Sequence, residues 1–225
     1  MRNRRAIFPV CGVVAAVATA GLAVAGLLAA AMLAPTETTM GDAQRVVYVH
    51  VAVAWFGLLA FLVMAVAGLL YLLRRDLIWD TWAGAAAEVG WLCCSLTLVT
   101  GSLWAHAAWQ TWWTWDPRLT TSFILWMVYS GCLLARASVA DGHHRARIGA
   151  VLALLGAADL PLVVMATRWF RGIHPVTPEM EPAMRVALLL SVTGLTAVFA
   201  LLLVRRQTQL ALRNSLATIR QRLDR

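Results

Sequence analysis

The sequence predicts an all-α integral membrane protein with six transmembrane helices and both termini on the cytoplasmic side. The first observation behind this prediction is composition, since 61% of the 225 residues are hydrophobic and only 13% are charged. A chain with so little polar surface does not fold as a water-soluble globule. The second is a series of six apolar runs, each close to the ~20 residues that a spanning helix needs. The third is the uneven distribution of arginines among the connecting segments.

Each apolar run is predicted to be a helix because backbone hydrogen-bonding groups cannot stay unpaired in lipid. The short alternating strands of a membrane β-barrel have no counterpart in this sequence. Neither an internal repeat nor a long linker divides the chain, so residues 1–225 are expected to form a single membrane domain. The predicted spans are about 10–34, 47–73, 83–104, 121–137, 147–168 and 184–204.

The two ends of the chain carry further signals. The N-terminal MRNRR and the apolar run after it imitate a signal peptide, but the run from about Ala6 to Ala34 exceeds the usual ~7–15 residues. A retained helix is therefore expected. Residues 205–225 place leucine and isoleucine at helical spacing among arginines. This pattern is typical of a basic amphipathic helix at the inner membrane surface, and a docking helix for a partner subunit is the alternative.

Arginine placement sets the predicted topology. All nineteen basic residues are arginine, and the fourteen at the termini and in the second and fourth connecting segments mark the expected cytoplasmic side. The outer segments are then about 35–46, 105–120 and 169–183. Because the positive charge is spread over short loops, membrane lipid and not nucleic acid is the expected partner. The arginines assigned to the outer side are Arg45, Arg118, Arg168, Arg171 and Arg185.

A cluster of five tryptophans marks the second outer segment. An aromatic belt at a membrane surface uses one or two tryptophans per helix end, so this number favours a platform for a flat ligand over a belt. An aspartate, a proline and an arginine follow at once. The cluster and its flank are Trp104, Trp109, Trp112, Trp113, Trp115, Asp116, Pro117 and Arg118.

Spacing within this segment predicts its local structure. Trp109, Trp112 and Trp113 stand at i, i+3 and i+4, which would place them on one face of a short helix lying flat on the outer surface. Asp116 and Pro117 would end that helix. The cap of the next span is expected among Thr120, Thr121 and Ser122.

Haem is a flat ligand that would fit such a platform, because it carries two carboxylates and an iron that accepts imidazole ligands. His50 lies near the outer end of the second span and His174 in the third outer segment, so they could clamp a haem between them. His106, inside the tryptophan segment, is a rim residue or an alternative ligand. His143 and His144 fall in an inner loop and are expected to be solvated. The candidate partners of the haem propionates are Arg45, Arg118, Arg168 and Arg171.

The segment WQTWWTWDPRLT, Trp109–Thr120, resembles the tryptophan-rich WWD signature of haem-handling membrane proteins. The wider pattern resembles the cytochrome c maturation protein C family, also called haem exporter protein C. VTGSLW at Val99–Trp104 leads into the signature, and Arg45–Val51 resembles the first outer segment of the family, which carries a histidine ligand. Asp159–Pro161 and His174 fit its second ligand region. The resemblance covers about residues 35–205.

Four positions depart from the family pattern. Gln110 replaces a usual glycine, Pro117 a usual alanine, and Ala52 a frequent proline; all three are tolerable in a loop or at a helix end. Asp159 stands where asparagine is common. An acid inside a span is costly, so Asp159 is expected to be protonated or paired with Arg168 or another group. It would be either a structural acid or one with a role in haem or proton handling.

The resemblance implies a function at the periplasmic face of the bacterial inner membrane. There the protein would transiently hold haem b, without a covalent bond, with His50 and His174 as axial ligands and the WWD face cradling the porphyrin. It would present the haem to a periplasmic haem chaperone, CcmE, for covalent loading. The ATP-binding cassette pair CcmA and CcmB and the small membrane protein CcmD would assist, since this chain has no phosphate-binding loop. The protein would not be an enzyme, although it could template attachment to the chaperone.

Two other interpretations stay open on the sequence alone. The first is a haem lyase subunit of the same superfamily, but such lyases resemble longer chains with more spans and an added histidine pair. The second is a transporter or structural subunit without haem, in which the tryptophans form an ordinary aromatic belt.

Overall fold

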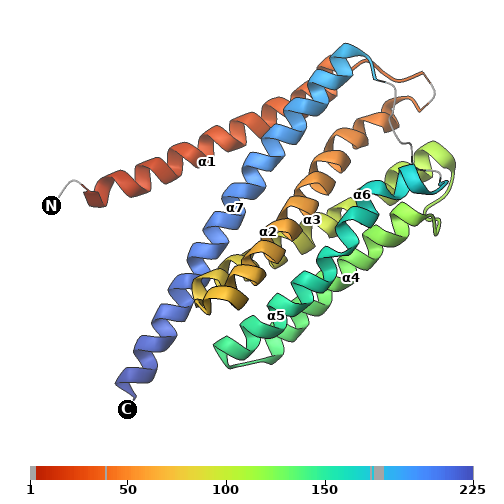
Figure 1. Ribbon diagram of the computed structural model, residues 1–225. Helices are drawn as coiled ribbons and strands as arrows, with labels where there is room; N and C mark the ends of the chain where they lie inside the picture. The colour runs from red at the N-terminus through yellow and green to blue at the C-terminus, as the bar shows by residue number, and fades with distance from the viewer. Residues whose placement is uncertain (1–3, 39, 173, 175–179, 225) are drawn as a thin grey trace.

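The computed structural model describes residues 4–38, 40–172, 174 and 180–224, and it is helical almost throughout (Figure 1). Six helical segments are long and apolar enough to cross a membrane, which confirms the predicted all-α, six-span architecture. The short irregular helix η1 ends the first span, and the short irregular helix η2 begins the second. The elements are α1 (Arg4–Leu28), η1 (Ala29–Leu33), η2 (Asp42–Arg45), α2 (Val46–Arg74), α3 (Leu77–Trp109), α4 (Pro117–Ser138), α5 (Gly142–Ala157), α6 (Asp159–Trp169) and α7 (Pro182–Leu223).

The helices form a bundle around the α2–α3 hairpin, with α7 on one side and α4, α5 and α6 on the other (Figure 1). The first turn of α1 and the last turn of α7 lie away from the turn that joins α3 to α4 (Figure 1). Packing at the centre is close because small residues face aromatic ones. The Tyr129 hydroxyl donates to the Gly57 carbonyl (3.0 Å), and a Cβ added at Gly90 would lie 2.5 Å from that hydroxyl. Such close approach is typical of helix pairs in membranes.

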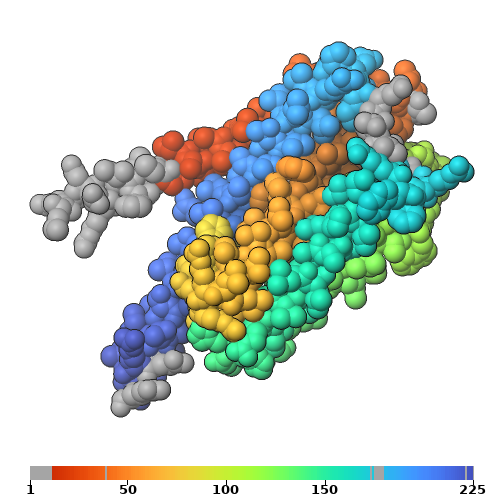
Figure 2. Space-filling model, viewed as in Figure 1, coloured from red at the N-terminus to blue at the C-terminus, as the bar shows by residue number. Residues whose placement is uncertain are grey.

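Helix α1 contacts the rest of the protein mainly through α7. A Cβ at Gly26 would lie 2.8 Å from the Leu190 carbonyl oxygen, and one at Gly194 would lie 2.7 Å from the Leu22 carbonyl oxygen. Ser191 donates a hydrogen bond across the same contact to the Gly26 carbonyl. The described residues of α1 lie along the upper half of α7 in the space-filling view (Figure 2), and Arg205 of α7 donates to the Gly12 carbonyl at 3.1 Å. The α1–α7 pair is therefore held by backbone proximity at two glycines.

Several helices extend beyond the predicted spans. The third span was expected at 83–104, whereas α3 covers Leu77–Trp109, with Asp76 accepting a hydrogen bond from the Ile78 amide at its start. Hydrophobicity marks only the part of a helix inside lipid, whereas capping residues mark its ends. The expected tail at 205–225 is not a separate element, because α7 runs through it without a break.

The fifth span, expected at 147–168, is interrupted. Helix α5 ends at Ala157 and α6 begins at Asp159, with Ala158 between them in a turn. Pro161 has no amide hydrogen and cannot donate to the Ala157 carbonyl, which accounts for the interruption. The two helices still act as one span by length and composition.

Candidate functional site

A pocket opens at the end of the bundle where α3 leads into α4. Helices α2, α3, α4 and α6 wall it together with His174 from the segment before α7. The space between its walls, including the part open to solvent, is about 820 Å³. Aliphatic side chains make up much of the lining. The lining residues with polar or aromatic side chains are His50, Thr97, Ser102, Trp104, Trp109, Trp113, Arg118, Ser122 and His174.

Trp104 connects the two histidines of this pocket. Its ring centroid lies 6.2 Å from that of His50 and 6.2 Å from that of His174, and it also packs on Trp109 at 4.8 Å. The indole is buried. Three segments that are distant in sequence therefore meet at one tryptophan, which spacing along the chain could not establish.

Hydrogen bonding fixes the orientation of His50. Its Nδ1 lies 3.0 Å from Thr100 Oγ1, while that hydroxyl lies 2.6 Å from the carbonyl oxygen of Leu96. Because a hydroxyl has one proton, which here goes to Leu96, Thr100 must accept from a protonated Nδ1. Nε2 of His50 then keeps its lone pair for a metal, the arrangement usual for metal-binding histidines. A Cβ at Gly101 would lie 2.9 Å from His50 Cε1, so this glycine makes room for the ring.

The WWD segment is not the flat helix that its spacing predicted. Helix α3 continues to Trp109 and ends at Gln110, whose φ of 56° is left-handed, and residues 111–116 are not helical. Trp112 turns outward, is 56% exposed and stacks on His106 with ring centroids 4.0 Å apart. Trp113 turns toward the pocket. The three tryptophans predicted to share a face thus divide between the pocket and the surface.

The start of α4 also differs from the prediction, which placed its cap among Thr120, Thr121 and Ser122. Asp116 is the N-cap, accepting a hydrogen bond from the Leu119 amide at 2.8 Å, and Pro117 begins the helix. A Cβ at Gly172 would lie 3.0 Å from the Asp116 carboxylate. The acid of the WWD segment therefore packs against the backbone that follows α6.

The arginines proposed for the outer side occupy different environments. Arg118 lines the pocket from the first turn of α4 and is half-buried. Arg45 instead donates to the carbonyl oxygens of Ala30 and Ala31 in η1 and pairs with Asp42. Arg168 and Arg171 are not among the described lining residues. The structure thus brings one of the four predicted arginines to the histidines.

Comparison with known proteins identifies the family. A family model described as CcmC, heme exporter protein C, matches residues 3–222. The chain belongs to the heme exporter protein C family. Curated relatives named heme exporter protein C include those of Paracoccus denitrificans, with 33% identity over 97% of this chain and 92% of the relative, and Escherichia coli, with 29% identity over 92% and 87%. The Bradyrhizobium diazoefficiens relative is 36% identical over 66% of this chain, and the match spans just 57% of that protein.

Buried polar atoms without partners concentrate in the WWD segment of this heme exporter family member and in the last turns of α3 just before it. Among the described residues, these atoms include Trp104 Nε1, His106 Nδ1, Thr114 Oγ1 and Asp116 Oδ2. Buried polar groups are normally hydrogen-bonded, so these atoms can take a hydrogen bond from a ligand, a partner or water. The indole N–H of Trp104 is such a donor, on a residue that lines the pocket.

Asp159 also has a buried oxygen without a hydrogen-bond partner among the described residues. It begins α6, is buried, and its Oδ2 accepts no hydrogen bond from any described residue. The ion pairs within the described part of the chain do not include Asp159 or Arg168, so the structure does not form the Arg168 pair that was one of the expected alternatives, and a protonated Asp159 stays a prediction.

Some residues on the α3 side of the pocket were not predicted from the sequence. Thr97, Thr100, Gly101 and Trp104 stand at i, i+3, i+4 and i+7, so they share the face of α3 that meets His50. Only Trp104 was predicted. The helical spacing back from Trp104 was the signal that could have identified the others.

Proposed function

We propose that this protein binds haem b in the pocket, with His50 and His174 as axial ligands, and presents it to a partner for cytochrome c biogenesis. The observation that carries the proposal is the convergence of these two histidines, from separate segments, on one aromatic pocket. Histidines in this setting are suited to iron, because Nε2 of His50 retains its lone pair. Membership of the heme exporter protein C family supports the same cargo.

The remaining lining suits a porphyrin. Trp104, Trp109 and Trp113 offer aromatic surface for the macrocycle. Arg118 would pair with a propionate, since guanidinium groups bind carboxylates through charge-assisted hydrogen bonds. The unpaired N–H of Trp104 supplies a further donor.

We place the pocket at the periplasmic face of the bacterial inner membrane. The end of the bundle that holds His50 is the arginine-poor end, and positively charged loops favour the cytoplasm. The opposite end carries Arg74, Arg75, Arg145 and Arg147 in or next to its turns.

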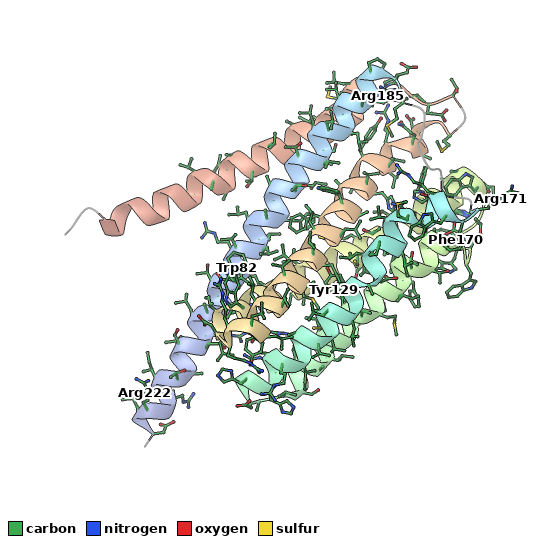
Figure 3. All side chains as sticks on the ribbon, viewed as in Figure 1. Trp82, Tyr129, Phe170, Arg171, Arg185 and Arg222 are labelled. Atoms are coloured by element: carbon green, nitrogen blue, oxygen red, sulfur yellow. The ribbon has the colours of Figure 1, made fainter. Side chains whose placement is uncertain are left out.

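The partner would be the periplasmic haem chaperone CcmE, with CcmA, CcmB and CcmD assisting its release. Trp112 and Trp115 beside the pocket are 56% and 72% exposed, and Trp169 and Phe170 are also exposed. Phe170 and Arg171 extend from the end of α6 (Figure 3). Exposed aromatic groups of this kind are frequent at protein–protein contacts, so they form a surface on which a chaperone could dock while haem is held behind it.

The test is to purify the protein in detergent after expression with and without the chaperone under haem-replete conditions. The proposal predicts a Soret band in the protein alone and covalent haem on the chaperone when both are present. A colourless protein would favour the aromatic-belt interpretation. Haem found on apocytochrome instead of the chaperone would favour a lyase.

A further inference from the structure

A second cleft lies at the opposite end of the bundle, between α4 and α7 and over α3. Helices α4 and α7 both pack on α3 but have little direct contact with each other, which leaves the gap open. Its volume is about 950 Å³, part of which is open to solvent. Its described lining comes from α3, α4 and α7, with Arg145 from α5.

Two arginines at the back of the cleft share one carboxylate. Asp80 is fully buried and pairs with Arg136 at 2.6 Å and with Arg145 at 3.1 Å. The Arg136 guanidinium passes close to two glycines, since a Cβ would lie 2.6 Å from it at Gly84 and 2.8 Å at Gly149. These arginines are thus fixed in place, and one negative charge faces two positive charges.

The α7 wall adds two more arginines and one acid. Arg206 binds both carboxylate oxygens of Glu88, at 2.5 and 2.9 Å. Arg213 is exposed and forms no ion pair with any described acid. Four arginines and two carboxylates therefore line the cleft, leaving two positive charges without a counter-charge among its lining residues.

The surroundings of these charges are apolar. Leu133 and Leu210 line the cleft itself, and the neighbouring Leu134 and Leu212 are 70% and 59% exposed on α4 and α7. A ligand of this cleft should combine an anionic group with hydrocarbon. Uncompensated positive charge between membrane helices is a recognised setting for anionic lipid headgroups.

We propose that this cleft binds the phosphate headgroup of an anionic phospholipid, with its acyl chains along α4 and α7. The inference depends on the charges and the six spans and not on haem binding at the other end. The phosphate would lie among Arg136, Arg206 and Arg213, where guanidinium groups can donate to its oxygens.

The experiment is native mass spectrometry of the full-length protein in detergent, titrated with phosphatidylglycerol or with phosphatidylcholine. We expect one tightly retained phosphatidylglycerol. Arg213→Gln should weaken its retention about fivefold, the effect of ~1 kcal/mol per arginine. The matched control is Arg222→Gln, at the far end of α7 and outside the cleft (Figure 3), which should leave retention unchanged. Glu88→Gln removes a negative charge and should tighten binding.

Three outcomes would overturn the proposal: equal retention of the two lipids, equal losses in Arg213→Gln and Arg222→Gln, or displacement of the lipid by soluble glycerol phosphate at matching concentration. The last would assign the cleft to small soluble anions. The Soret band recorded on the same samples reports the haem site separately, so failure of one proposal is distinguishable from failure of the other.

Discussion

Trp104 and His174 lie with their ring centroids 6.2 Å apart and their planes at 78°. The contact joins the end of α3 to the segment before α7, and the same indole reaches His50 of α2. Because Trp104 is buried between groups from separate elements, it is the residue through which the two proposed ligands are positioned together.

Gly101→Ala should weaken haem binding because its Cβ would lie 2.9 Å from His50 Cε1 and displace the ring. Overpacking of this kind costs about 1–3 kcal/mol. The matched control is Gly131→Ala, also in a helix, where a Cβ meets nothing within 4 Å. Haem titration followed by absorbance measures the haem affinity of both variants. Equal affinities in the two variants would mean that Gly101 does not position His50.

Thr100→Val should reduce haem affinity about 10- to 100-fold, the usual effect of removing the outer partner of a metal-binding histidine. Valine keeps the shape but cannot accept from His50 Nδ1. Thr193→Val on α7 is the control, since among the described residues its hydroxyl bonds to the Leu189 carbonyl of its own helix and to no other group. Unchanged affinity in Thr100→Val would argue against the protonation state assigned to His50.

Arg118→Gln should lower haem affinity because a charge-assisted hydrogen bond of about 1.5–3 kcal/mol is lost. Arg171→Gln, which removes the same charge from an exposed residue outside the described pocket lining, should have little effect. Haem titration of the two variants gives the dissociation constants to compare. A larger loss of haem affinity in Arg171→Gln than in Arg118→Gln would mean that the propionate contacts the segment after α6 instead of Arg118.

Gly26→Ala should destabilise the fold because its Cβ would lie 2.8 Å from backbone atoms of α7, forcing the two helices apart. Gly21→Ala in the same helix has open space and should be neutral or slightly stabilising, since alanine favours helices over glycine by ~1 kcal/mol. Thermal unfolding in detergent measures the difference. Equal melting temperatures would contradict the close α1–α7 contact.

The six spans could be predicted from sequence because lipid imposes helical structure on any long apolar run. Their ends could not, because they depend on local caps such as Asp76 and Asp116, and on breaks such as the one before Pro161. Hydrophobicity carries no information about these features.

The candidate site was predictable in its chemistry but not in its geometry. His50, His174 and Arg118 could be named from residue type and predicted side of the membrane. The flat tryptophan helix was wrong because the left-handed Gln110 ends α3 and redirects the chain. The place of Arg45 could not be predicted, because its guanidinium binds carbonyl groups in the π-helical turn of η1, a local feature without a sequence signal.

The central claim is that His50 and His174 are the axial ligands of a bound haem. The most direct measurement is electron paramagnetic resonance of the ferric haem protein for the wild type, His50→Ala, His174→Ala and the control His143→Ala. His143 lies at the other end of the bundle, against Tyr71. We predict a low-spin signal in the wild type and in His143→Ala, and conversion to high spin or loss of haem in each of the other two variants. An unchanged low-spin signal in both His50→Ala and His174→Ala would contradict the claim.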